Sequence, residues 1–478
     1  MACKQHVITL QSIQVAGSQL SVRYSYDDYH FSQSFWYDFN LQSLDAIYGS
    51  QFMEKVYFHC AAFSVFQLCS LKPDVLDWGP YAHLHTAEFE RVWKTAWNKL
   101  SGQWRYENNL PHVKEARFAS KPTSATNPVE IQHSGEIPTT LVFFGGGKDS
   151  LTMMELLSRA DIPFYSLSYS HTMYGCSTVQ HQLNDVVLDS ISPTRKARHH
   201  KLNVLDDLLD SPVLDSLGKS LGIKTFAEAE TTASLFFALP ILLYYRYTAI
   251  AIANERSANT GNLVWECTGE EINHQWVKSK EAELLLGSYV REALVWNAHY
   301  FSVLQPIHDV VIFNTAATRP DAIVHTHSCN IVLPWCKRCS KCCYVWLNFM
   351  AYLPCDLVNG MFQNENLLDA RENETHFTQM IGLGAQRPFE CIGDFDEAKL
   401  AFELCRRKGI RGRAMEIYEE KVLPTLNQAV LTRMVDKYTT VYPMESTNVP
   451  PEIWDRLLPV LKQAGEDARK KLETALLQ

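Results

Sequence analysis

A run of three glycines followed by polar residues is the part of the chain best suited to bind a phosphate. The run lies in LVFFGGGKDSLTMMELL, residues 141 to 157, and comprises Gly145, Gly146, Gly147, Lys148, Asp149 and Ser150. An apolar strand pattern precedes the run and a helical pattern follows it. Glycines let backbone N–H groups at the start of a helix approach an anion closely, and Lys148 adds positive charge. We expect a phosphate at this loop; the alternative is a tight turn that is merely rich in glycine.

A second group of polar residues follows the apolar run YTAIAIA, residues 247 to 253. Open α/β sheets bind ligands at the carboxyl ends of their strands, so polar residues directly after a strand are candidates for a site. The group comprises Glu255, Arg256, Ser257, Glu271, Asn273, His274, Gln275, Lys278 and Ser279. His274 or Glu271 could move protons, whereas Lys278 and Arg256 could hold a carboxylate or a phosphate. The alternative for each residue is a place in a solvated loop.

Four cysteines are spaced as in a metal site. The stretch HSCNIVLPWCKRCSKCC places Cys329, Cys336, Cys339 and Cys342 at C-x6-C-x2-C-x2-C. Four thiolates at these intervals can surround Zn²⁺ as a tetrahedron and leave no position for water, which predicts a structural zinc site. The alternatives are reduced cysteines packed as small apolar residues, or redox chemistry. A local cluster among 13 cysteines also favours a reducing compartment.

Three segments resemble one enzyme family. GGGKDS is similar to the S-G-G-x-D-S pyrophosphate loop of the PP-loop ATP pyrophosphatases, with Gly145 where Ser is usual. It is not a Walker loop, in which Lys is followed directly by Ser or Thr. ANERSAN, residues 253 to 259, and the E-x-N-H-Q-x-x-K-S pattern of residues 271 to 279 resemble a bacterial PP-loop branch, the ATP-dependent epimerases of UDP-N-acetylmuramoyl-L-alanyl-L-glutamate. QRPFECIG, residues 386 to 393, also resembles a late segment of that family.

The resemblance implies an enzyme that uses ATP and Mg²⁺ to invert the terminal glutamate of a peptidoglycan precursor. Adenylation of the carboxylate, with release of pyrophosphate, would make the α-proton easier to remove. ATP contacts are implied for the glycine loop, Glu255 and Ser257, and proton transfer for His274, with Glu271 as the second candidate. Arg256 and Lys278 would orient the peptide carboxylate. A late cysteine set like this one also occurs in the cyano-deazaguanine synthases, another PP-loop family.

Three other functions share parts of this pattern and stay open at this point. A PP-loop enzyme that modifies tRNA would share the glycine loop and a zinc site, but it should carry a basic face. An amide-forming ligase would also adenylate a carboxylate and would then pass the acyl group to an amine. A nucleotide sensor would bind ATP without releasing pyrophosphate.

Composition and charge favour a folded cytoplasmic enzyme with a small substrate. The chain has 478 residues, of which 46% are hydrophobic, and a net charge of -9. This acidic balance argues against a broad nucleic-acid surface. The most basic run, TRKARHHK at residues 194 to 201, is either solvated surface or a contact for a substrate diphosphate. The N-terminal residues lack a basic segment before an apolar run, so we expect no secretion.

The elements that must position these residues fall into three parts. Alternation around Gly17 predicts a hairpin over residues 6 to 26, and apolar spacing predicts a helix over 89 to 100, so residues 1 to 119 are expected to form an α+β domain. A linker is expected at 120 to 138. Residues 139 to 355 alternate apolar runs with helical patterns, which predicts an α/β fold with a doubly wound parallel sheet. The resemblance implies that this is a PP-loop/HUP-like ATP-binding domain. Residues 356 to 478 are expected to be helical.

The apolar segment at residues 233 to 253 is about as long as a membrane span of ~20 residues. Pro240 and Arg246 interrupt it, and an arginine inside a bilayer is costly. We therefore expect a buried helix that runs into a core strand, and no membrane contact. A membrane span is the alternative.

Overall fold

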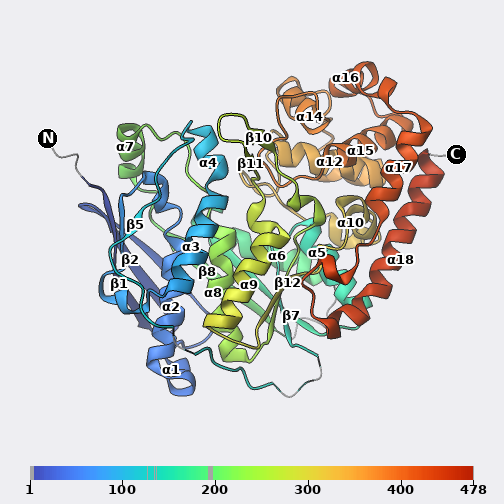
Figure 1. Cartoon of the computed structure of the whole chain (residues 1–478). Helices are drawn as coiled ribbons and strands as arrows, with labels where there is room; N and C mark the ends of the chain where they lie inside the picture. The colour runs from blue at the N-terminus through green and yellow to red at the C-terminus, as the bar shows by residue number, and fades with distance from the viewer. Residues whose placement is uncertain (1–4, 126, 134, 136, 192–197, 477–478) are drawn as a thin grey trace.

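The computed structural model has one ten-stranded sheet with helices packed against it (Figure 1). It describes residues 5–125, 127–133, 135, 137–191 and 198–476. The strand order is β12-β9-β6-β7-β8-β3-β2-β1-β4-β5, and β10 and β11 form a separate ribbon. The strands are β1 (Val7–Ala16), β2 (Gln19–Tyr26), β3 (Tyr29–Trp36), β4 (Val75–Asp77), β5 (Arg117–Phe118), β6 (Thr140–Phe143), β7 (Phe164–His171), β8 (His199–Asp206), β9 (Ala249–Ile252), β10 (Leu263–Trp265), β11 (Glu270–Ile272) and β12 (His299–Ser302).

Helices occupy most of the remaining chain. They are α1 (Gln42–Tyr48), α2 (Ser50–Ser64), α3 (Ala87–Leu100), α4 (Gly102–Glu107), α5 (Lys148–Arg159), α6 (Ser177–Ile191), α7 (Pro212–Leu221), α8 (Glu230–Tyr245), α9 (Lys280–Ala293), α10 (Asp309–Ala316), α11 (Pro320–Ile323), α12 (Ser340–Tyr352), α13 (Cys355–Met361), α14 (Glu374–Met380), α15 (Phe395–Arg407), α16 (Arg413–Lys421), α17 (Gln428–Thr439) and α18 (Pro451–Leu476). The prediction of a helical C-terminal region is confirmed.

The N-terminal strands form one end of the sheet as antiparallel hairpins. β1, β2 and β3 pair in order, and Gly17, with φ +59°, turns the chain between β1 and β2. The predicted hairpin is confirmed, and its apolar side chains Leu20, Val22, Tyr24 and Tyr26 are all buried. The predicted helix at 89 to 100 is α3, whose apolar stripe is buried as expected.

Five parallel strands make the other half of the sheet. β8, β7, β6, β9 and β12 are neighbours in that order, which is 3-2-1-4-5 in chain order. The order reverses between β6 and β9, and sheets of this kind bind ligands at the carboxyl ends of the strands beside the reversal. The glycine loop follows β6 and the second polar group follows β9. The predicted α/β class with a parallel sheet is confirmed in this half.

The two halves join through one antiparallel strand pair. β3 pairs with β8, with Gln33 opposite Asp206 and Trp36 opposite Asn203. One sheet therefore contains strands from both sides of the predicted linker at 120 to 138. The division of the chain into domains at that linker stays a prediction.

Alternate residues of the strands face two different apolar cores. Leu141 of β6 belongs to one core and its neighbour Val142 to the other. Helices α2, α3, α8 and α9 pack in the first core, and α5, α10, α12 and α15 to α18 pack in the second. In Figure 1 the first set crosses the front of the molecule, and the orange and red C-terminal helices lie to its right. Helices thus cover both faces of the sheet.

The apolar segment at 233 to 253 is built as predicted, because the buried helix α8 leads into the buried strand β9. Within the described ranges, no helix is long and apolar enough to cross a membrane. Of the basic run at 194 to 201, residues 194 to 197 lie outside the described residues. Its later part enters β8, where His200 is buried.

Candidate active site

A cavity of about 300 Å³ lies where β6 and β9 end. The lining includes Gly145, the run from Gly147 to Ser150, Glu255 and Lys278. The structure therefore brings most of the predicted glycine loop together with part of the second polar group. This is the position at which the reversal of strand order predicts a ligand.

Gly146 is required in the loop because of its conformation and its neighbours. It has φ +74°, and a Cβ at this position would overlap His327 Nε2 and Asn184 Oδ1. The His327 backbone N–H donates a hydrogen bond of 3.0 Å to Gly146 O, which ties the loop to the segment before α12. Gly147 then caps α5, and backbone N–H groups at a helix start attract anions. The loop thus has a geometry that could hold an anion.

Lys148 is buried beside carboxylates instead of extending freely into the cavity. Its Nζ lies 2.5 Å from Asp149 Oδ1 and 2.6 Å from Asp309 Oδ1. The Tyr344 hydroxyl donates a 2.9 Å hydrogen bond to Asp309 Oδ2 and fixes that carboxylate. Burial alone would lower the pKa of Lys148, but the carboxylates raise it, so the ammonium stays charged.

Acidic groups outnumber Lys148 in this part of the cavity. Burial first, and then Asp309 and Asp149, raise the pKa of Glu255 to about 7. Burial also raises the pKa of Asp309, although Lys148 opposes this. A cation placed among these carboxylates would lower such pKa values, because it favours the ionised forms. Oxygen donors of this kind suit Mg²⁺.

Cys391 lines the same cavity, and the sequence analysis did not single it out. Lys278 Nζ lies 2.9 Å from Cys391 Sγ, and His274 Nε2 lies 3.9 Å from the same sulfur. Burial alone would raise the pKa of this thiol, but Lys278, Lys341 and His274 lower it to about 5. The segment QRPFECIG, noted for its resemblance, was the signal that could have identified this residue.

Three buried polar atoms in the cavity lining have no hydrogen-bond partner among the described residues. They are Asn184 Oδ1, Asn254 Nδ2 and His327 Nε2. Buried polar atoms in folded proteins nearly always have a partner. The three atoms therefore indicate that a polar ligand completes this cavity.

His274 lies behind Cys391 and outside the cavity lining. Gln103 Oε1 accepts a 2.5 Å hydrogen bond from His274 Nδ1, which leaves Nε2 to face the Cys391 sulfur. Burial would lower the pKa of His274, but the neighbouring Cys391 raises it. The imidazole thus contacts the cavity through the cysteine.

Glu271, Ser257 and Arg256 lie in other surroundings. Glu271 is exposed on β11, and its carboxylate accepts a 2.9 Å hydrogen bond from Gly261 N. The Ser257 hydroxyl donates a 2.6 Å hydrogen bond to the buried Glu397. The Arg256 guanidinium stacks 3.4 Å from the centre of the Tyr442 ring and lines a second hollow of about 370 Å³. The structure therefore does not bring these three predicted residues into the cavity lining.

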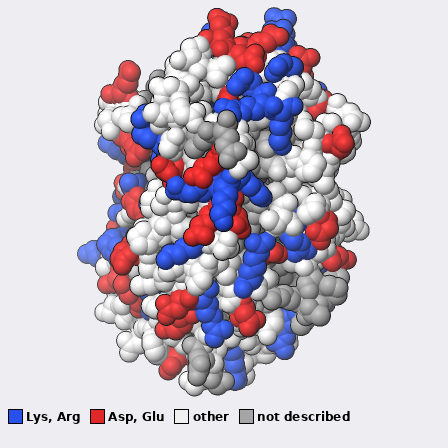
Figure 2. Space-filling view, turned by 90° about the vertical axis from the view of Figure 1, so that its right-hand side faces the viewer, with Lys and Arg blue, Asp and Glu red and all other residues white. Residues whose placement is uncertain are grey.

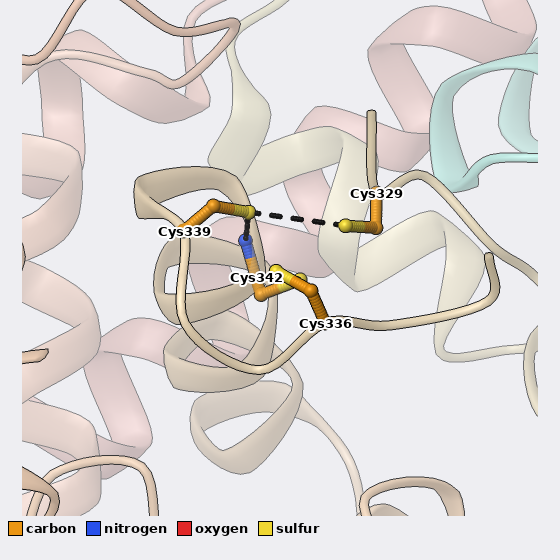
Figure 3. A group of neighbouring side chains, drawn as sticks. All are labelled: Cys329, Cys336, Cys339 and Cys342. Atoms are coloured by element: carbon orange, nitrogen blue, oxygen red, sulfur yellow. Dashed lines mark hydrogen bonds between the residues drawn. The ribbon is translucent and has the colours of Figure 1, made fainter. Parts of the chain in front are cut away.

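The four predicted metal ligands meet at the start of α12. Figure 3 shows their side chains converging from the preceding loop and from the first turn of the helix. Cys329 and Cys339 have sulfurs 4.0 Å apart, those of Cys336 and Cys342 are 3.8 Å apart, and all four sulfurs lie within 4.8 Å of one another. A zinc tetrahedron with Zn–S bonds of about 2.3 Å has edges of about 3.8 Å. The four cysteines can therefore hold a zinc ion.

The cysteine cluster and the cavity share one loop. Cys329 belongs to the cluster, and it also lines the cavity together with His327, Ser328, Asn330 and Leu333. The backbone N–H groups of Ile331 and Val332 donate hydrogen bonds of 3.4 Å to Cys329 Sγ. A metal at the cluster would thus hold one wall of the cavity in place.

Family models match most of the chain, including the glycine loop, the segment from Asn254 to Lys278, the cysteine cluster and Cys391; Asp309 lies between the matched ranges. A model described as the MurL N-terminal domain matches residues 6–184 and 232–303, and one described as the MurL C-terminal domain matches residues 325–434. The chain belongs to the MurL family. Within this family assignment, the glycine loop lies in the N-terminal match and the cysteine cluster in the C-terminal match.

Three MurL relatives carry the same name, UDP-N-acetyl-alpha-D-muramoyl-L-alanyl-L-glutamate epimerase. A Micromonospora protein is 29% identical over 320 residues, which are 64% of this chain and 65% of the relative. A Salinispora tropica protein is 29% identical over 64% of each chain. A Xanthomonas oryzae pv. oryzae protein is 25% identical over 74% of this chain and 75% of the relative. The chain thus matches slightly under two thirds of the length of the first two relatives. No solved structure matches the chain significantly.

Proposed function

We propose that this chain uses ATP to invert the terminal glutamate of UDP-N-acetylmuramoyl-L-alanyl-L-glutamate or of a related glutamyl peptide. The observation that carries the proposal is the single cavity that joins the glycine loop to Glu255, Lys278 and Cys391. The names of the three MurL relatives support the substrate and the reaction. We place this reaction in the cytoplasm, where ATP is supplied.

The nucleotide half of the proposal rests on the glycine loop and the strand order. The order of the parallel strands, 3-2-1-4-5, reverses beside the strand that the glycine loop follows, which is where doubly wound sheets bind nucleotides. This supports our assignment of the domain to the PP-loop ATP pyrophosphatases of the HUP type. The ATP pyrophosphate would lie on the backbone N–H groups between Gly145 and Ser150 at the start of α5. The side chain of His327 faces this loop, its Nε2 has no hydrogen-bond partner within the described part of the chain, and it would complete the contact.

Adenylation explains why inversion of a glutamate would consume ATP. Removal of the α-proton beside a free carboxylate would place a second negative charge next to the first. Attack of the carboxylate on the α-phosphorus of ATP releases pyrophosphate and yields a mixed anhydride, whose carbonyl can accept the electron pair from the C–H bond. Water then cleaves the inverted adenylate to the free acid and AMP.

The carboxylates Asp149, Glu255 and Asp309 would hold Mg²⁺ against the phosphates, and that ion would supply charge stabilisation as pyrophosphate leaves. Lys278, which lines the same cavity, would hold the glutamyl carboxylate before it is activated. Four cysteine thiolates leave no open position on zinc, so a zinc ion at the cluster would be structural.

The first test incubates the protein with UDP-N-acetylmuramoyl-L-alanyl-L-glutamate, Mg²⁺ and either ATP or a nonhydrolysable ATP analogue. The glutamate is then released by acid hydrolysis and its enantiomers are separated. We expect D-glutamate to accumulate only with ATP. Inversion without ATP, or an amide product in the presence of an amine, would show that the reaction is a different one.

A further inference from the structure

We propose that the Cys391 thiolate removes the α-proton of the adenylated glutamate, with Lys278 and His274 as the groups that hold it as a thiolate. This proposal rests on the proposed function. It assigns proton transfer to a residue that touches the cavity, whereas His274 and Glu271 do not line it.

The position of Cys391 is the first argument. Its side chain and that of Lys278 line the cavity that also contains the glycine loop, so a substrate activated at the loop reaches both. Buried polar atoms of Asn184, Asn254 and His327 in the same lining have no hydrogen-bond partner among the residues that the structure describes, which indicates independently that a polar ligand binds here. The cysteine is therefore part of a built site.

The charges around the sulfur are the second argument. Lys278 Nζ donates a hydrogen bond of 2.9 Å to Cys391 Sγ, which stabilises the thiolate. His274 Nδ1 already donates to Gln103 Oε1, so the ring can also donate from Nε2 toward the sulfur only when it is protonated. Both cations favour the same state, a thiolate with a lone pair that can accept a proton.

The proton transfer balances without a further reactant. The C–H bond of the α-carbon breaks, its proton joins the sulfur, and its electron pair moves into the anhydride carbonyl as an enolate. Cys391 Sγ and Lys278 Nζ lie 2.9 Å apart, so this thiolate serves one face of the α-carbon. A water molecule then protonates the enolate from the other face, and the proton on the sulfur returns to solvent. His274 is a positioning residue, because it acts through the cysteine.

The test separates adenylation from proton transfer. Adenylation is measured as substrate-dependent exchange of labelled pyrophosphate into ATP, and proton transfer as deuterium uptake at the α-carbon in D₂O. For Cys391→Ser we expect deuterium uptake to fall at least ~100-fold, the usual contribution of a general base, while the pyrophosphate exchange persists. Cys267→Ser, an exposed cysteine outside the cavity lining, is the matched control and should take up deuterium at the wild-type rate.

Deuterium uptake near the wild-type rate in Cys391→Ser would overturn the assignment of the cysteine and leave the proposed function intact. Absence of pyrophosphate exchange in the wild-type protein would overturn the proposed function itself. If Cys391→Ser does not fold, alkylation of the wild-type protein tests whether Cys391 is a thiolate. We expect iodoacetamide to modify Cys391 at pH 6 to 7 and bound substrate with ATP to protect it. A Cys391 that resists alkylation until about pH 8.5, the range of an ordinary thiol, would contradict the proposal.

Discussion

At the scale of single residues, the glycine loop depends on the absence of a side chain at Gly146. A methyl group there would meet His327 and Asn184, and the residue also holds a positive φ that L-residues adopt at a cost of roughly 1–2 kcal/mol. We expect Gly146→Ala to weaken ATP binding at least ~10-fold, which corresponds to about 1.4 kcal/mol. Isothermal titration calorimetry with ATP and Mg²⁺ measures the change.

The matched control for this loop is Gly222→Ala. Gly222 also has a positive φ, +68°, but a Cβ there would meet nothing within 4 Å, and the residue lies outside the cavity lining. The Gly222→Ala substitution should lower the stability of the fold without changing the affinity for ATP. Equal ATP binding by wild type and Gly146→Ala would show that the nucleotide does not use this cradle.

Lys278 is the strongest of the three cations, with Lys341 and His274, that lower the pKa of Cys391 and so set the pH range in which the sulfur can accept a proton. With the pKa of Cys391 lowered to about 5, the thiolate form persists above that pH, so deuterium uptake should change little between pH 6 and 8 and decline as the pH falls through 5. Without the ammonium, the pKa of Cys391 should rise toward the ordinary thiol value of ~8.5, leaving only a few per cent thiolate at pH 7.

We therefore expect Lys278→Met to take up deuterium at least ~10-fold more slowly at pH 7 and to recover as the pH rises toward 9. Lys280→Met is the matched control, because Lys280 lines the second hollow and is absent from the cavity lining. A flat pH profile in Lys278→Met would mean that the lysine does not control the thiol.

The residues of the site were predictable from sequence where they follow one strand, and not where they come from distant segments. Gly145 to Ser150 form a local strand-loop-helix unit, which the sequence pattern shows directly. Cys391 reaches Lys278 across 113 residues of sequence, and no local pattern indicates such a contact. Glu271 follows the right strand, but the β10–β11 ribbon carries it to the surface.

At the scale of elements, the loop before α12 joins the cysteine cluster to the cavity. Cys329 supplies one sulfur to the cluster, and two residues earlier His327 contacts the glycine loop. Loss of the metal would release the loop and therefore the wall of the cavity. Zinc and ATP binding should accordingly be coupled.

We expect Cys336→Ser to lose zinc, measured by inductively coupled plasma mass spectrometry, and to bind ATP at least several-fold more weakly. Cys336 itself does not line the cavity, so the second effect must pass through the loop. Cys355→Ser, outside the cluster, should keep both properties. Full ATP affinity in a zinc-free Cys336→Ser protein would show that the loop holds its shape without metal.

At the scale of the whole molecule, the N-terminal region contacts residues that lie next to the cavity lining. Gln103 of helix α4 accepts a hydrogen bond from His274 Nδ1, and Arg105 of the same helix pairs with Glu270 at 2.5 Å. The Tyr106 hydroxyl donates a 3.0 Å hydrogen bond to Gln386, in the segment that carries Cys391. The role of residues 1 to 119 could not be predicted from the sequence. Both the β3–β8 pairing and these contacts join segments far apart in the chain, and no pattern of neighbouring residues indicates them.

We expect Gln103→Leu to slow epimerisation several-fold while leaving the KM for ATP unchanged. The substitution removes the hydrogen bond that orients the His274 ring toward Cys391, and residue 103 does not contact the nucleotide loop. Steady-state kinetics separates the two constants. Asn98→Leu, an exposed change on the neighbouring helix α3, should alter neither the rate of epimerisation nor the KM for ATP. An increased KM for ATP with an unchanged rate would contradict this role for α4.

The face of the molecule that carries the C-terminal helices agrees with a small-molecule substrate. Figure 2 shows basic and acidic side chains interspersed over the face of the C-terminal helices, with no continuous field of one sign. Such a face does not favour nucleic acid, which binds to extended basic surfaces.

The central claim, that the glutamyl carboxylate attacks the α-phosphorus of ATP, is tested most directly by an oxygen label. The substrate is prepared with ¹⁸O in the terminal α-carboxylate and incubated with the protein, ATP and Mg²⁺, and the nucleotide product is analysed by mass spectrometry. The account predicts AMP that carries one ¹⁸O atom, formed together with the inverted glutamate. ADP, or AMP without label, would contradict it.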